Sequence, residues 1–143
     1  MGKSQPEGML FKSLIYGNMR GISPGLRGNK IEYLKNLSDM NNSEIIAVTE
    51  THLNNNVDDC EIHIPGWTVF RCDRNMRSGG CVLTYVKESL TVSNEFKGSD
   101  SVTEFLCLYI NDLNLSVINI YRPPGTNSES FGEAIKKIDN WLD

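Results

Sequence analysis

Two polar residues of the 143-residue chain stand where an apolar stretch ends, and their side chains suit a cation or a phosphate. Asn18 closes the stretch at 10–19, and Glu50 closes EIIAVTE. Ligands of α/β sheets gather at the carboxyl ends of strands. A carboxylate there can hold a hard cation such as Mg²⁺, and an amide can orient a carboxylate or phosphate oxygen. A solvated strand-end Glu50 and an Asx turn at Asn18 are the alternatives.

A third candidate is the dipeptide Tyr121-Arg122, which ends another apolar stretch and precedes two prolines. A tyrosine hydroxyl beside a guanidinium fork can bind phosphate. A rigid turn with a half-buried tyrosine fits the same residues equally well.

The densest basic cluster consists of Arg71, Arg74 and Arg77, followed by two glycines. Such a cluster can follow a nucleic-acid backbone, or it can be a solvated hairpin loop. His52 and His63 lack the acidic partner and nucleophile of a catalytic triad. The chain offers no good general base.

These candidates need elements to position them, and the hydrophobic periodicity predicts both helices and strands. Helices are expected at about 30–41 and from about 131, the second with a capping box of Ser130 and Glu133. Strand, helix, strand at the start favours neighbouring or parallel pairing of the first two strands. Later strands follow one another directly, which predicts an α+β fold. The expected strands are 10–19, 43–51, 67–71, 81–86, 90–96, 105–110 and 115–121.

The net charge and the distribution of apolar residues exclude some classes of protein. A net charge of −4 gives no overall electrostatic footprint for nucleic acid. No apolar run approaches the roughly 18 residues that span a bilayer, and the N-terminus lacks a signal-peptide stretch. We therefore expect an intracellular protein, nuclear or cytoplasmic and not secreted, with no membrane partner. Residues 1–9 are expected to be a disordered tail and 10–143 one domain. The last helix runs to the final residue without a stop signal, which suggests a truncated domain.

The order of these features resembles the endonuclease/exonuclease/phosphatase family, and most closely the apurinic-endonuclease-like nuclease domains of non-LTR retrotransposons. The resemblance spans about residues 11–142. It is carried by five ordered segments: IYGNMRGI, NKIEYLKNL, EIIAVTETHL, IPGWTVFRCDRNMRSGGCVLTYVKESL and INIYRPPGTNSESF.

The resemblance implies half of a four-layer αββα sandwich and a site for Mg²⁺ or Mn²⁺. Glu50 would be the metal ligand, Asn18 would help to position the metal, and Tyr121 would lie against the scissile phosphate. The intact domain would have DNA as its partner, and Arg122 and the three clustered arginines, chosen from their charge and position alone, are the candidate contacts to it.

The family's Gly-Asp-x-Asn and Asp-His segments are expected to follow the last helix, so we expect this chain to be catalytically incomplete without the missing C-terminal half. The alternatives are a phosphatase of the same fold that acts on a lipid or inositol phosphate, and a non-enzymatic mobile-element remnant or interaction module.

Overall fold

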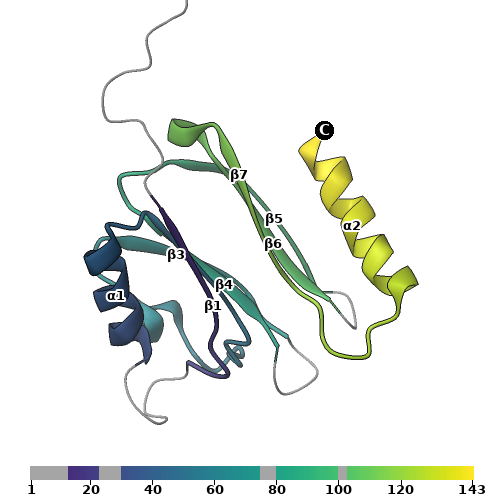
Figure 1. The fold of residues 1–143 in the computed structure, drawn as a ribbon, viewed down its shortest axis with the longest axis horizontal. Coiled ribbons are helices and arrows are strands. Elements are labelled where there is room, and N and C mark those ends of the chain that lie inside the picture. Colours follow the sequence, from purple (N-terminus) through teal and green to yellow (C-terminus); the bar gives the residue numbers. More distant parts are fainter. Residues whose placement is uncertain (1–12, 23–29, 75–79, 100–102) are drawn as a thin grey trace, which may run out of the picture.

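The structure, a computed structural model, describes residues 13–22, 30–74, 80–99 and 103–143 (Figure 1). These residues contain seven strands and two α-helices. The strands are β1 (Leu14–Asn18), β2 (Ile45–Thr49), β3 (Trp67–Cys72), β4 (Val82–Lys87), β5 (Val92–Ser99), β6 (Glu104–Ile110) and β7 (Leu115–Tyr121). The helices are α1 (Lys30–Asn41) and α2 (Ser128–Leu142), with short 3₁₀ helices at Asp59–Ile62 and Asn111–Leu113.

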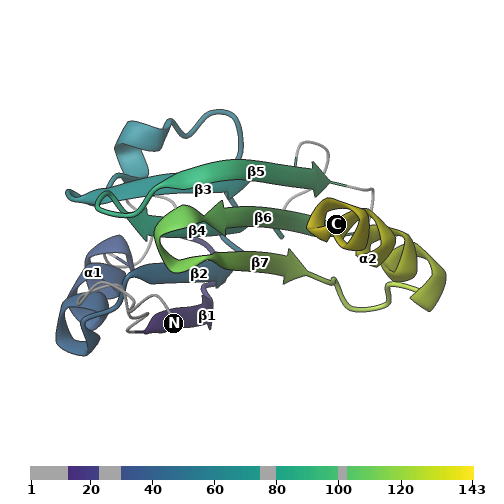
Figure 2. The same cartoon turned by 90° about the horizontal axis from the view of Figure 1, so that it is seen from above.

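These elements form four layers, with α1 outside one sheet and α2 outside the other (Figure 1). The first sheet has the order β1-β2-β4-β3, and the second has the order β5-β6-β7. Viewed from above, β5 lies over β3, while β7 lies on the side of β1 and β2 (Figure 2). The predicted α+β class and its αββα layering are confirmed.

The opening of the chain folds as its strand-helix-strand pattern predicts. β1 and β2 pair in parallel, with Leu14 opposite Ile45 and Asn18 opposite Thr49. The connecting helix α1 buries Leu34 against Ile46 of β2 and the rest of the core between α1 and the first sheet. Parallel pairing places the carboxyl ends of both strands at one edge of the sheet, which is where the site residues lie.

The second sheet is covered on both faces along β6. Alternate residues of a strand point to opposite faces. Leu106 and Leu108 therefore pack against the first sheet, while Phe105 and Cys107 pack against α2. All four are buried. The nearly continuous apolar run of β6 is thus covered on both faces, whereas β7, with Ile118 exposed, is only partly covered.

The side chain of Asn119 crosses the apolar interface between the sheets. Asn119 of β7 is buried, and its amide nitrogen donates to the carbonyl oxygens of Val48 and Leu83 at 3.1 Å and 3.0 Å. These acceptors belong to β2 and β4. The amide therefore bridges the two sheets by hydrogen bonds as well as by packing.

Helix α2 begins three residues earlier than the capping-box pattern predicts. Its N-cap is Asn127, whose side chain accepts a hydrogen bond from the Ser130 amide at 2.8 Å. The expected cap, Ser130, therefore lies inside the first turn. Asn is as good an N-cap as Ser, so two candidate caps three residues apart made the sequence ambiguous. Across the described residues, no helix is both long and apolar enough to cross a membrane.

Two glycines are expected to respond oppositely to alanine. A Cβ atom on Gly98 of β5 would lie 2.5 Å from Cζ of the buried Phe105 ring, so Gly98→Ala should destabilise the protein by about 1–3 kcal/mol through overpacking. Gly132 lies inside α2 with open space around its Cα, so Gly132→Ala should stabilise by about 0.5–1 kcal/mol. Urea denaturation of both variants measures the change in the free energy of unfolding. Changes of the same sign in the two variants would contradict the packing of Gly98 against Phe105 or the open space around Gly132.

Candidate active site

Three residues singled out in the sequence meet at one end of the sandwich. Asn18 and Glu50 lie at the carboxyl ends of β1 and β2, and Tyr121 ends β7 of the other sheet. The Tyr121 hydroxyl donates to Oε1 of Glu50 at 2.8 Å. The Asn18 side chain also hydrogen-bonds to Glu50. The carboxylate therefore joins the two sheets and receives polar contacts from both.

The backbone around Glu50 adopts the left-handed conformation, with positive φ, that L-residues rarely adopt. Glu50 has φ 53°, and its neighbours Arg20 and His52 have φ 48° and 57°. Each left-handed, non-glycine residue costs of the order of 1 kcal/mol, and such residues cluster at functional sites. The Glu50 carbonyl accepts from the Gly21 amide at 2.7 Å, which holds this turn beside the loop after β1.

Hydrogen bonding and burial together set the ionisation of the two central groups. The pKa of Glu50 is lowered chiefly by the hydrogen bond from Tyr121; desolvation raises it by less, and the hydrogen bond from Asn18 lowers it by a still smaller amount. Burial and the hydrogen bond to Glu50 raise the pKa of Tyr121 to about 12. At neutral pH the site therefore holds a carboxylate and a protonated phenol.

Tyr121→Phe should raise the pKa of Glu50, because it removes the largest cause of the lowering. Asn18→Ala should raise it by less. Because the folded-state pKa lies below its usual value, the stabilisation from this group is present at neutral pH and is lost as the pH falls through the folded pKa. Carbon-13 NMR titration of the Glu50 carboxyl measures the shift. An unchanged pKa in Tyr121→Phe would show that the hydrogen bond does not form in solution.

A buried ion pair lies beside Tyr121. Arg74 Nε donates to Oε1 of Glu104, whose side chain is 1% exposed. Glu104 opens β6 and stands opposite Tyr121 in the β6–β7 register. A Cβ atom on Gly80, which has φ 72°, would lie 2.6 Å from Nη2 of Arg74. A side chain at position 80 would therefore have to displace this guanidinium.

Arg71, the first of the clustered arginines, directs its guanidinium toward protein oxygens. Its Nε and Nη2 donate to the carboxylate of Asp73, and Nη1 donates to the carbonyl of Val57 at 2.7 Å and to Asp59 at 3.1 Å. Arg74 is held by Glu104. Nucleic-acid contact by these two arginines stays a prediction, and these protein contacts would compete with it.

The remaining predicted contacts are dispersed. Arg77 lies outside the described residues. Arg122 donates to the carbonyl of Thr126 at 2.8 Å and lies 4.7 Å from the centre of the Phe131 ring, so it supports the turn into α2. The His52 amide donates to the carbonyl of Gly80 at 3.1 Å, which ties the segment after Glu50 to the start of β4.

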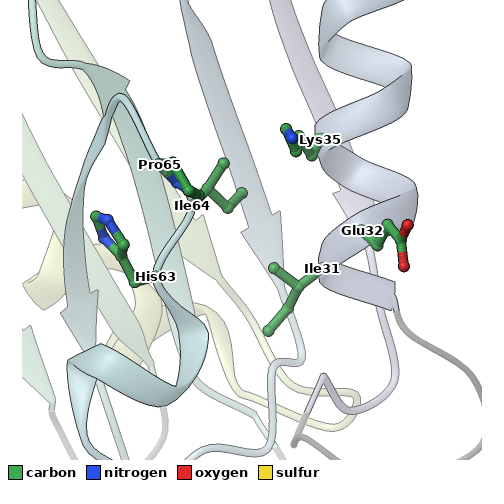
Figure 3. A pocket seen from close by; sticks show the side chains of 6 residues that line it. All are labelled: Ile31, Glu32, Lys35, His63, Ile64 and Pro65. Atoms are coloured by element: carbon green, nitrogen blue, oxygen red, sulfur yellow. The ribbon is translucent and has the colours of Figure 1, made fainter.

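A small pocket lies elsewhere, between α1 and the segment that follows the first 3₁₀ helix (Figure 3). Its volume is about 220 Å³, and it shares no lining residue with the Glu50 cluster. Its lining is half apolar and half polar or charged: Ile31, Glu32, Lys35, His63, Ile64 and Pro65.

Sequence reasoning missed Glu104 and Asn119, although strand periodicity held the signal. Glu104 has the same parity as the inward-facing Leu106 and Leu108, and Asn119 has the parity of Val117 and Tyr121. A polar residue on the apolar face of a strand must find a partner in the core. Sorting even and odd positions along both strands would have identified Glu104 and Asn119 as polar residues on the buried faces.

The donors around Glu50 fit a hard cation in part. Mg²⁺ is commonly held by one or two carboxylates with several waters, and here one ionised carboxylate and one amide lie together. Among the described residues, no group of three or more His, Cys, Asp or Glu side chains gathers to hold a metal. The oxygens of Glu50 and Asn18 would make up only part of the coordination sphere of such an ion.

No protein family matches the chain, and no curated protein matches it. Solved structures do. An AP endonuclease from Archaeoglobus fulgidus superposes with a TM-score of 0.59 at 16% identity, covering 81% of this chain and 43% of that one. Truncated Caenorhabditis elegans TDP2 superposes with a TM-score of 0.55 at 12% identity, covering 90% and 55%. The chain thus spans about half the length of these structures. At such low identity the likeness shows the fold alone: the chain shares the fold of these two structures over the part that it spans.

Proposed function

We propose that this chain supplies about half of the active site of a metal-dependent phosphodiesterase that cleaves DNA, of the type found in non-LTR retrotransposons. The observation that carries the proposal is the convergence of Asn18, Glu50 and Tyr121 from three strands and both sheets on one ionised carboxylate. The likeness in fold to an AP endonuclease supports the same class of reaction.

Each residue has a distinct task in this proposal. Glu50 and Asn18 hold Mg²⁺ or Mn²⁺ at the strand ends. The bound ion would polarise a phosphoryl oxygen and stabilise the charge that develops on it. Tyr121 keeps the Glu50 carboxylate ionised and oriented through its hydroxyl, and it stands at the edge where a phosphate would lie. We assign activation of the attacking water to a residue of the intact domain outside these 143.

The chain by itself is expected to bind Mn²⁺ through Glu50 and not to nick DNA. Calorimetric titration with Mn²⁺ tests the first part, with Glu50→Gln as the variant expected to lose binding. Incubation with supercoiled plasmid and Mg²⁺ tests the second. Nicking above the Glu50→Gln background would show that the chain is catalytically sufficient.

The substrate class is tested in an intact domain that contains this chain. Cleavage of plasmid DNA without phosphate release from inositol phosphates supports the proposal. The reverse pattern would identify a phosphatase of the same fold. Absence of both activities, together with absence of Mn²⁺ binding, would leave a non-enzymatic remnant.

A further inference from the structure

The contact between Tyr121 and Glu50 joins two sheets, so its length depends on how the sheets are held at this end. The two residues belong to β7 and to the turn after β2, which share no backbone pairing. A hydrogen bond of 2.8 Å across a packed interface is sensitive to small displacements. A second tie close by would fix it.

The ion pair of Arg74 and Glu104 crosses the same interface. Glu104 belongs to β6 of the second sheet, and Arg74 follows β3 of the first. Glu104 is the register partner of Tyr121, so their side chains share one face of the second sheet. The charges of Arg74 and Glu104 both act on the Tyr121 phenol. The pair therefore lies on the same face and at the same end of the second sheet as Tyr121, which contacts Glu50.

The segment that carries Arg74 is also attached to the Glu50 turn. The Arg74 amide donates to the sulfur of Cys81 at 3.0 Å, and that sulfur donates to the carbonyl of Leu53 at 3.2 Å. The His52 amide donates to Gly80. Hydrogen bonds thus run from the residues just after Glu50 to the residues that flank Arg74.

The ion pair is buried and incompletely satisfied. Nη2 of Arg74 and Oε2 of Glu104 are inaccessible to solvent and lack hydrogen-bond partners among the described residues. A buried ion pair is a poor source of stability when compared with apolar residues of the same size. Its position beside the site therefore calls for a role other than packing.

We propose that Arg74 and Glu104 are positioning residues, a cross-sheet tie that holds the Tyr121 hydroxyl on the Glu50 carboxylate. This inference rests on the proposed function only in its consequence for metal binding. The tie acts through Tyr121 and touches neither metal nor substrate.

The test removes the tie without stranding a charge. Arg74→Met combined with Glu104→Leu replaces both partners by apolar side chains. Tyrosine labelled with carbon-13 at Cζ reports the phenol, and Tyr121→Phe assigns the resonance. The double variant should shift the Tyr121 resonance in the direction that Glu50→Gln shifts it. It should also raise the dissociation constant for Mn²⁺ about tenfold, as weakening a hydrogen bond to a charged group implies.

Two further variants separate positioning from general stability. In a Tyr121→Phe background the double variant should cause no additional loss of Mn²⁺ affinity, because the tie acts through the lost hydroxyl. Tyr85→Phe removes a buried hydrogen bond to the Ile62 carbonyl in the core between α1 and the first sheet. It should leave the Tyr121 resonance and Mn²⁺ affinity unchanged.

An unshifted Tyr121 resonance in the folded double variant would overturn the inference. If that variant does not fold, the resonance in Glu104→Gln decides, since this change keeps the shape and weakens the ionic contact. If Mn²⁺ binding by the unmutated chain does not depend on Glu50, the proposed metal site fails, while the resonance still decides whether the tie positions Tyr121.

Discussion

Arg74→Ala is expected to cost about 3–5 kcal/mol of folding free energy, the range for removing one partner of a buried ion pair. The Glu104 side chain is 1% exposed, and Arg74 Nε is its ionic partner. Without the guanidinium a carboxylate remains in the core with no opposite charge. The free energy of unfolding from urea denaturation at neutral pH measures the loss.

The double variant Arg74→Met with Glu104→Leu is the control for this loss. Replacing both partners by apolar residues is often neutral or stabilising, so most of the lost stability should return. An Arg74→Ala protein as stable as the unmutated one would show that Glu104 is neutral or solvated in the folded state. That result would show that Arg74 and Glu104 do not form a stabilising ion pair.

Glu50→Gln is expected to lower single-turnover cleavage by an intact domain about a hundredfold or more. The amide keeps the shape of the carboxylate and loses the charge that holds the cation. Metal stabilisation of phosphoryl charge is worth several kcal/mol, and each 1.36 kcal/mol is about tenfold in rate. Tyr121→Phe should cost less, with Asn18→Ala between the two. A Mg²⁺ titration should show that Glu50→Gln needs more Mg²⁺ to reach half its maximal rate.

Glu88→Gln is the matched control for that experiment. Glu88 is an exposed carboxylate in the turn after β4, at the opposite end of the sheet from Glu50. Its replacement should change neither the rate nor the Mg²⁺ dependence. Equal behaviour of the two variants would mean that Glu50 is not a ligand.

The fold was predictable because its signals are local. Apolar runs bounded by turn residues located every strand, and the helical spacing of Ile31, Leu34 and Leu37 located α1. Asn18, Glu50 and Tyr121 were accessible for the same reason, since each ends a run. Their convergence on one carboxylate is a finding of the structure, and their catalytic roles stay predictions.

Long-range pairing was not predictable from the sequence. Arg74 and Glu104 are thirty residues apart, and a basic residue in a loop with Gly-Gly reads as solvated. Only the packing of one sheet on the other reveals that this half-buried arginine pairs with Glu104 of β6. The 3₁₀ helix at Asp59–Ile62 was likewise missed, because its polar sequence reads as a loop.

The buried amide of Asn119 fixes the position of one sheet relative to the other along the strand direction. Apolar faces alone tolerate displacement along the strands, since one aliphatic side chain can replace another. Moving β7 by one repeat of two residues would leave this amide buried with its donors unmet, at a cost of about 1–3 kcal/mol. Asn119 reaches Val48, and two residues further along both strands Tyr121 reaches Glu50. The hydrogen bonds of Asn119 in the core therefore also determine that Tyr121, two residues nearer the end of the sheets, lies opposite Glu50.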